Sequence, residues 1–129
     1  MTRCAIVFSV VWFAGCSGNA PQPTDPATAQ KLGELEEIYS LISLYSDQAG
    51  KAPAAPKDLA QFENAYPLGY EQIRSGRAVV LWGARPNPNA TAVLAYAKDV
   101  PGQGGAVLLQ NGRVQQMTAA EFAAAPKAK

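Results

Sequence analysis

The feature that most constrains the fold is a long amphipathic segment in the first half of the chain, residues 27–49. Its apolar side chains recur every three or four residues, at Leu32, Leu35, Ile38, Ile42 and Tyr45. This spacing places them on one face of a helix. Asp25 and Pro26 suit the N-cap and first helical position, and Gly50 suits the C-terminal cap. A helix with one apolar stripe must bury it, so the rest of the chain has to supply a covering surface.

That covering surface is predicted to be a small β-sheet. There are four candidate strands: 77–82 and 91–97 are rich in apolar residues, and 106–110 and 113–117 flank a hairpin turn signal. Asn111-Gly112 separates the last two and predicts a two-residue type I′ hairpin turn, in which both residues have positive φ. Such a turn would place Leu109 opposite Val114. We then expect the face that carries Val107, Leu109 and Val114 to pack on the long helix.

Together these segments predict an α+β fold with a long N-terminal helix packed on a small antiparallel sheet, an order that also suits a pilin-like architecture. Residues 57–62 suggest one or two helical turns, and residues 66–70 suggest irregular structure. Thr118 to Glu121 matches a capping box, so a short helix is expected to about residue 124. We predict one globular domain over 26–124 and a loose tail over 125–129.

The first residues have the composition of a signal peptide. Arg3 is followed by Cys4 to Ala14 without a charged side chain. As a helix this run would span roughly 16 Å, about half of a bilayer core, so it is too short to cross a membrane. Residues 1–15 are therefore predicted to be a leader. Residues 16–25 contain Pro, Asn and Gln without an apolar period and are predicted to be a flexible tether.

The end of this leader, Phe13-Ala14-Gly15-Cys16, resembles the lipobox of bacterial lipoproteins, with Phe13 in place of the usual leucine. The resemblance implies cleavage between Gly15 and Cys16, attachment of diacylglycerol to the Cys16 sulfur, and acylation of the new amine by a chain such as palmitate. Ser17 at the next position implies sorting to the outer rather than the inner membrane. The alternative is an ordinary secretory signal with a free thiol at Cys16. Cys4 leaves with the leader, so Cys16 would have no intramolecular disulfide partner.

Charge and composition exclude several classes of chemistry. Arg3 carries the single surplus charge, so removal of the leader leaves a formally neutral chain, and nucleic acid is not an expected partner. The chain has no histidine, which excludes Ser-His-Asp and Cys-His catalysis and removes the commonest zinc ligand. Residues 102–105 are glycine-rich but precede a strand, so a mobile hairpin loop is expected there and not a phosphate site. No cofactor or metal is therefore predicted.

Catalysis would then need a pair of carboxylates. The candidates are Asp58, Glu63, Glu71 and Asp99, which we expect to be separate and largely solvated. The acidic residues of the long helix, Glu34, Glu36 and Glu37, are interpreted as a solvated face near the positive end of that helix. Four aromatic residues could form a platform for sugar or peptide, or could be ordinary core residues: Tyr66, Tyr70, Trp82 and Tyr96.

The segment from Gly105 to Val114, followed by Thr118 to Phe122, is similar to the closing hairpin of pseudopilin-like secreted proteins of planctomycetes. In this chain Asn111 stands where that family has Asp, and no prepilin cleavage site is present. The resemblance implies a pilin-like domain that serves a secretion or pilus-like system. A lipid on Cys16 would then replace the apolar stem as the membrane anchor.

The sequence as a whole therefore predicts a lipid-anchored protein of the bacterial cell envelope, facing the periplasm or the exterior, with the outer membrane favoured. We expect a non-catalytic binding or structural module whose partners are the membrane and another envelope protein. The expected binding surfaces are the sheet and two loops, residues 83–90 and 98–105. The alternatives are an accessory of a pseudopilin-like system and, less favoured, a carboxylate-dependent hydrolase.

Overall fold

The computed structural model describes residues 26–129. The predicted leader, the lipobox with Gly15 and Cys16, and the tether lie outside these residues. The elements in chain order are α1 (Pro26–Ala49), α2 (Pro56–Leu59), the 3-10 helix η1 (Ala60–Phe62), α3 (Pro67–Arg74), β1 (Ala78–Val80), β2 (Val93–Ala97), α4 (Val100–Gln103), β3 (Gly105–Leu109), β4 (Val114–Met117) and α5 (Ala119–Ala124).

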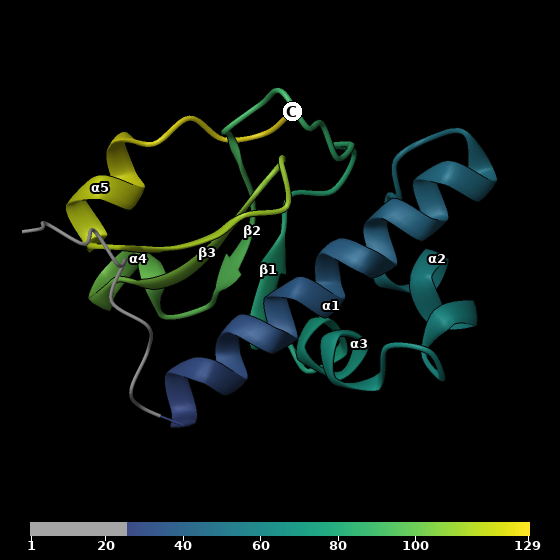
Figure 1. Ribbon diagram of the computed structural model, residues 1–129, viewed down its shortest axis with the longest axis horizontal. Helices are drawn as coiled ribbons and strands as arrows, with labels where there is room; N and C mark the ends of the chain where they lie inside the picture. The colour runs from purple at the N-terminus through teal and green to yellow at the C-terminus, as the bar shows by residue number, and fades with distance from the viewer. Residues whose placement is uncertain (1–25) are drawn as a thin grey trace, which may run out of the picture.

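The predicted α+β fold is confirmed. The strands form a four-stranded antiparallel sheet in the order β1-β2-β3-β4, and α1 packs across one face of it. Figure 1 shows α1 crossing the molecule with α2 and α3 on one side and the sheet on the other. At the end of α1, Gly50 has a φ of 69° and donates its N–H to the Ser46 carbonyl at 2.9 Å. This is the glycine cap that the sequence predicts.

Both faces of the sheet are buried. We call the core residues that α1 shares with α2, α3 and one face of the sheet the main cluster; its most buried large side chains are Leu35, Ile38, Leu41, Ile42, Leu59, Leu94 and Leu108. The second cluster covers the opposite face and comprises Val93, Val100, Val107, Leu109 and Phe122. Burying a side chain of this size stabilises the fold by about 1.5–3 kcal/mol. The stripe of α1 and the two sheet faces therefore account for much of the apolar burial in residues 26–129.

The β3–β4 hairpin differs from the prediction by one residue. Leu109 and Arg113 share a backbone hydrogen bond of 2.9 Å, and the Gly112 N–H donates to the Leu109 carbonyl at 3.0 Å. Gly112 has a φ of 87°, whereas every non-glycine residue of 26–129, Asn111 included, has a negative φ. The turn is thus a three-residue loop with a left-handed glycine at its end, and the predicted type I′ turn is wrong.

This longer loop also reverses the predicted sheet face. Leu108, and not Leu109, pairs with Val114, and both pack on α1 in the main cluster. Val107 and Leu109 point to the second cluster instead. A shift of one residue exchanges the two faces of a strand. The expectation that Val107, Leu109 and Val114 together face the helix is therefore wrong.

Gly112→Val should nevertheless destabilise the domain by about 1–3 kcal/mol. A β-branched residue is strained at positive φ, and a Cβ at this position would lie 3.1 Å from two carbons of the Tyr39 ring. Thermal unfolding measures the effect. Gly102→Val is the matched control, because no heavy atom lies within 4 Å of a Cβ there and its φ is not positive. Equal melting temperatures for the two variants would contradict this account of the turn.

The expectation of irregular structure over residues 66–70 is wrong, because α3 begins at Pro67. Proline suits the first helical position, but Tyr66 provides no side-chain cap. Glu37 of α1 supplies the missing acceptor: its Oε2 accepts the Gly69 N–H at 2.7 Å. The first N–H groups of a helix need such partners. Because this acceptor comes from a residue far away in the sequence, local pattern does not reveal it.

Two more expectations are corrected, one for residues 102–105 and one for the tail over 125–129. Residues 102–105 do not form a simple hairpin loop, because α4 occupies Val100–Gln103. The expected loose tail is held in place: Val93 donates its N–H to Pro126 and accepts one from Ala128, each at 2.8 Å. Lys127 Nζ donates to the carbonyls of Phe122 and Ala125. The tail is ordered because the N-terminal end of β2 offers it free backbone groups.

The predicted capping box of α5 is confirmed. Thr118 Oγ1 accepts the Glu121 N–H at 3.1 Å, and Glu121 Oε2 accepts the Thr118 N–H at 2.7 Å. The helix that follows presents Phe122 to the second cluster, where its ring centroid lies 4.6 Å from that of Tyr96. The short helix therefore covers the sheet face opposite α1.

Candidate ligand-binding site

A pocket of about 220 Å³ opens between α1, α3 and the edge of the sheet formed by β1 and the end of β2. Its apolar lining consists of Leu35, Ile38, Ala78 and Ala97. Leu35 and Ile38 are three residues apart and therefore neighbours on the surface of α1. Ala78 and Ala97 are a cross-strand pair, so they share one face of the sheet. Two small side chains at this pair leave a space that larger residues would fill.

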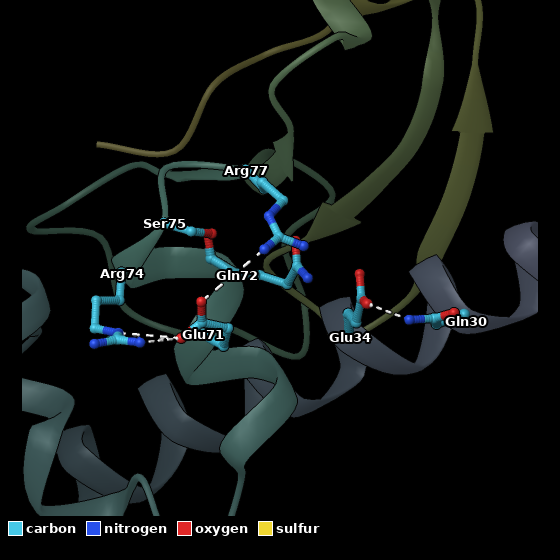
Figure 2. A network of polar contacts seen from close by, with 7 residues as sticks. All are labelled: Gln30, Glu34, Glu71, Gln72, Arg74, Ser75 and Arg77. Atoms are coloured by element: carbon cyan, nitrogen blue, oxygen red, sulfur yellow. Dashed lines mark hydrogen bonds and ion pairs between the residues drawn. The ribbon is translucent and has the colours of Figure 1, made fainter.

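The wall of the pocket contains a buried carboxylate, Glu34, which is only 8% exposed. Gln30 Nε2 donates a hydrogen bond to Glu34 Oε1 at 3.1 Å. Within residues 26–129 both ion pairs involve Glu71, so Glu34 has no cationic partner there. Figure 2 shows Glu34 on α1, away from the Glu71 pairs. Burial of a charge is costly unless it is paired, so Glu34 is a site at which an added cation would be favoured.

The rim of the pocket is mostly cationic. Lys31, Arg77 and Lys98 line it, with Asp99 as the acidic residue. Arg77 is 65% exposed, and its Nη2 lies 4.0 Å from Glu71 Oε1. Exposed pairs at this distance contribute little free energy. The rim cations are therefore available to an anionic group of a ligand.

Glu71 and Gln72 lie at the end of α3 beside this rim. The hydrogen bond from Arg74 to Glu71, followed by the attraction of the Glu71 charge, raises the pKa of Arg74 above its ordinary value. Arg74 Nη2 lies 2.5 Å from Glu71 Oε2, whereas Arg77 Nη2 lies 4.0 Å from Oε1, so Arg77 is the less firmly held of the two. Figure 2 places Gln72 between Arg77 and Glu34. Its amide can donate and accept hydrogen bonds, so it could contact either charged part of a ligand.

The predicted carboxylate candidates are not gathered in one site. Asp58 Oδ2 accepts the backbone N–H groups of Ala54 and Ala55, Glu63 is exposed, and Glu71 binds Arg74. Asp99 alone of the four lines the pocket. Glu34 lines the same pocket as Asp99, which the sequence did not predict.

The acidic residues of α1 also differ from the prediction of a solvated face. Glu36 is exposed, but Glu34 is buried and Glu37 binds Gly69. One signal could have revealed Glu34. It lies four residues before Ile38, and therefore on the apolar stripe where a charge is unexpected. Nothing local marks Gln72 as a pocket residue, because only the packing of α3 brings it there.

The four aromatic residues do not form one platform. Tyr70 is buried in the main cluster, and Tyr66 and Trp82 pack against that cluster. Tyr96 lies on the opposite face, against Phe122. They are core and core-edge residues, divided between the two sheet faces.

Other surfaces of residues 26–129 are less suited to enclose a ligand. The expected loop 83–90 borders an open, polar depression with Gln110 and Lys129. Leu68 is the one large apolar side chain that is exposed in this part of the chain, so no apolar stripe is available there for docking. No helix from α1 onward has the length and hydropathy needed to cross a bilayer. The same residues contain no group of three potential metal ligands.

Comparison with known proteins finds no matching family model, no matching curated protein and no matching solved structure. The resemblances to lipoproteins and to pseudopilin-like proteins therefore stay predictions. Function has to be inferred from the pocket and its residues.

Proposed function

We propose that this protein is a lipid-anchored lipoprotein of the bacterial cell envelope whose α+β domain is a non-catalytic binding module, with the pocket beside β1 as its ligand site. The observation that carries the binding proposal is the combination of an apolar floor, a buried Glu34 and a cationic rim. Small-molecule sites characteristically combine apolar walls with a few placed polar groups. The proposed anchor is Cys16, and the Phe13-Ala14-Gly15-Cys16 motif supports it. We place the protein at the outer membrane and retain another envelope protein as a further partner.

The composition of the pocket supports binding over catalysis. Its lining contains no serine, threonine, cysteine or tyrosine that could act as a nucleophile. The chain has no histidine to serve as a general base. A carboxylate-dependent hydrolase is the second candidate, because Glu34 and Asp99 line the same pocket. The pseudopilin-like accessory role is a third, supported by a long helix packed on an antiparallel sheet.

Binding can be tested by NMR on the full chain purified in detergent micelles with labelled methyl groups. We expect a mixture of small acids, amines and zwitterions to shift the methyl signals of Ile38, Ala78 and Ala97. Ala97→Leu should fill the pocket and weaken binding by about tenfold or more. Ala123→Leu, at an exposed position of α5, is the matched control and should bind like the wild type.

Two kinds of outcome would contradict the proposal. One is a set of shifts confined to residues outside the pocket, or binding that Ala97→Leu leaves unchanged. The other is turnover of an ester or glycoside that Asp99→Asn abolishes, which would favour the hydrolase. A merely misfolded Ala97→Leu is recognised by loss of the methyl signals of Leu41 and Leu59, which are buried in the main cluster and do not line the pocket.

A further inference from the structure

We propose that the pocket selects a small zwitterion with a branched apolar side chain, the chemical class of a free aliphatic α-amino acid. This inference rests on the proposed binding function. It assigns each part of such a ligand to a different part of the pocket: the ammonium group to Glu34, the carboxylate to the cationic rim, and the side chain to the apolar floor.

The size of the pocket favours a ligand of this kind. An apolar cavity of about 150 Å³ holds one benzene molecule. The pocket volume of about 220 Å³ is roughly one and a half times as large, which corresponds to about nine non-hydrogen atoms. Leucine is of this size. A disaccharide, a nucleotide or a folded peptide segment is too large to be enclosed.

Glu34 is the group that would bind the ammonium. It is more than nine-tenths buried, and its one hydrogen-bond donor in the described residues is the neutral amide of Gln30. A charge-assisted hydrogen bond from an ammonium group is about twice as strong as a neutral one. The ligand's cation would therefore give Glu34 the charged partner that residues 26–129 do not supply.

The rim would bind the carboxylate. Lys31, Arg77 and Lys98 outnumber Asp99 there, so the mouth attracts an anion while the wall attracts a cation. A ligand with only a negative charge would bring it close to Glu34. A ligand with only a positive charge would have to pass three cations. A zwitterion is complementary to both parts at once.

The apolar floor would bind the side chain. Leu35 and Ile38 present branched side chains, and the Ala78–Ala97 pair opposite them is small. A branched aliphatic group can occupy the space that these alanines leave. Removal of such a group from water is favourable in proportion to the apolar area that is covered.

The test compares three ligands with the same branched side chain and different charged groups. They are L-leucine, 4-methylpentanoate, which lacks the ammonium, and 3-methylbutylamine, which lacks the carboxylate. Each is titrated into the full chain in detergent micelles, and the methyl signals of Ile38, Ala78 and Ala97 are followed. L-leucine should shift these signals, and each single-charge analogue should bind at least about tenfold more weakly.

Variants of the protein test which residue binds each charged group of the ligand. Glu34→Gln should weaken the binding of L-leucine by about tenfold or more, and it should not weaken the binding of 4-methylpentanoate. Glu36→Gln is the matched control, because Glu36 is an exposed carboxylate of the same helix outside the pocket. Lys98→Gln should weaken L-leucine and 4-methylpentanoate but not 3-methylbutylamine. The melting temperature of each variant shows whether it is folded.

The outcomes separate this inference from the proposed function. If 3-methylbutylamine binds as tightly as L-leucine, the ligand is a cation. If 4-methylpentanoate binds as tightly as L-leucine and Glu34→Gln does not change the binding of L-leucine, the ligand is an anion. Either result overturns the zwitterion and keeps the binding module. If none of the three ligands shifts the pocket methyls, the inference is wrong, and the broader mixture then decides the proposed function by itself.

Discussion

Replacement of Gly69 by alanine is expected to destabilise the domain by about 3 kcal/mol, the upper part of the range for overpacked cores. Gly69 is buried where α3 lies against α1, and a Cβ there would lie 2.7 Å from Glu37 Cβ and 2.9 Å from the Ile38 backbone nitrogen. Backbone atoms cannot rotate away, so α3 itself would have to move. That movement would also lengthen the 2.7 Å hydrogen bond between Glu37 and the Gly69 N–H.

Chemical denaturation of the purified protein measures this effect. Gly33→Ala is the matched control, because Gly33 is a helical glycine of α1 and no heavy atom lies within 4 Å of the place that an added Cβ would take. Alanine is favoured over glycine in helices by about 1 kcal/mol, so Gly33→Ala should stabilise the domain. The two identical substitutions are thus expected to have opposite signs. If Gly69→Ala unfolds at the wild-type denaturant concentration, the close contact between α1 and α3 is wrong.

Cys16→Ser is expected to move nearly all of the protein from the membrane fraction to a soluble or unprocessed form. Each buried methylene of an acyl chain contributes about 0.8 kcal/mol, so two or three chains give near-permanent attachment. A serine hydroxyl cannot replace the thiol as the site of diacylglycerol transfer. Fractionation and mass spectrometry distinguish the lipidated, the soluble and the unprocessed forms of the protein.

Cys4→Ser is the control for this experiment, because Cys4 belongs to the predicted leader and leaves with it. It should leave attachment unchanged. Wild-type protein that is soluble and carries an unmodified Cys16 would rule out the lipid anchor and favour the ordinary secretory signal. The binding tests on the pocket would still be valid, since every pocket residue lies within 26–129.

Much of the secondary structure could be predicted because its determinants are local. The apolar stripe and Gly50 are sufficient to predict α1, and Thr118 with Glu121 is sufficient to predict the start of α5. The first two strands follow from their apolar runs, and the last two follow from the Asn111-Gly112 turn signal between them. A helix with one apolar face and strands with apolar residues have few ways to bury both, so the α+β class followed as well.

The site and most of the errors have a different origin, because they depend on contacts between residues distant in the sequence. The hairpin signal at Asn111-Gly112 located the turn, but one extra loop residue decided which strand face meets α1. The start of α3 depends on Glu37, and the order of the tail depends on β2. The pocket exists only where α1, α3 and the β1–β2 edge converge.

For this protein, the sequence alone determined α1, the strand segments, the start of α5, the class of fold and the lipobox-like motif at Cys16. Each of these is a pattern within a few neighbouring residues. Only the tertiary structure decided the pairing of Leu108 with Val114, the burial of Glu34 and the cationic rim around it. The sequence places Glu34 on the apolar stripe of α1, but it does not show which residues lie opposite it. The position of the sheet and of α3 makes Glu34 part of a pocket, and that position is set by the packing of the whole core.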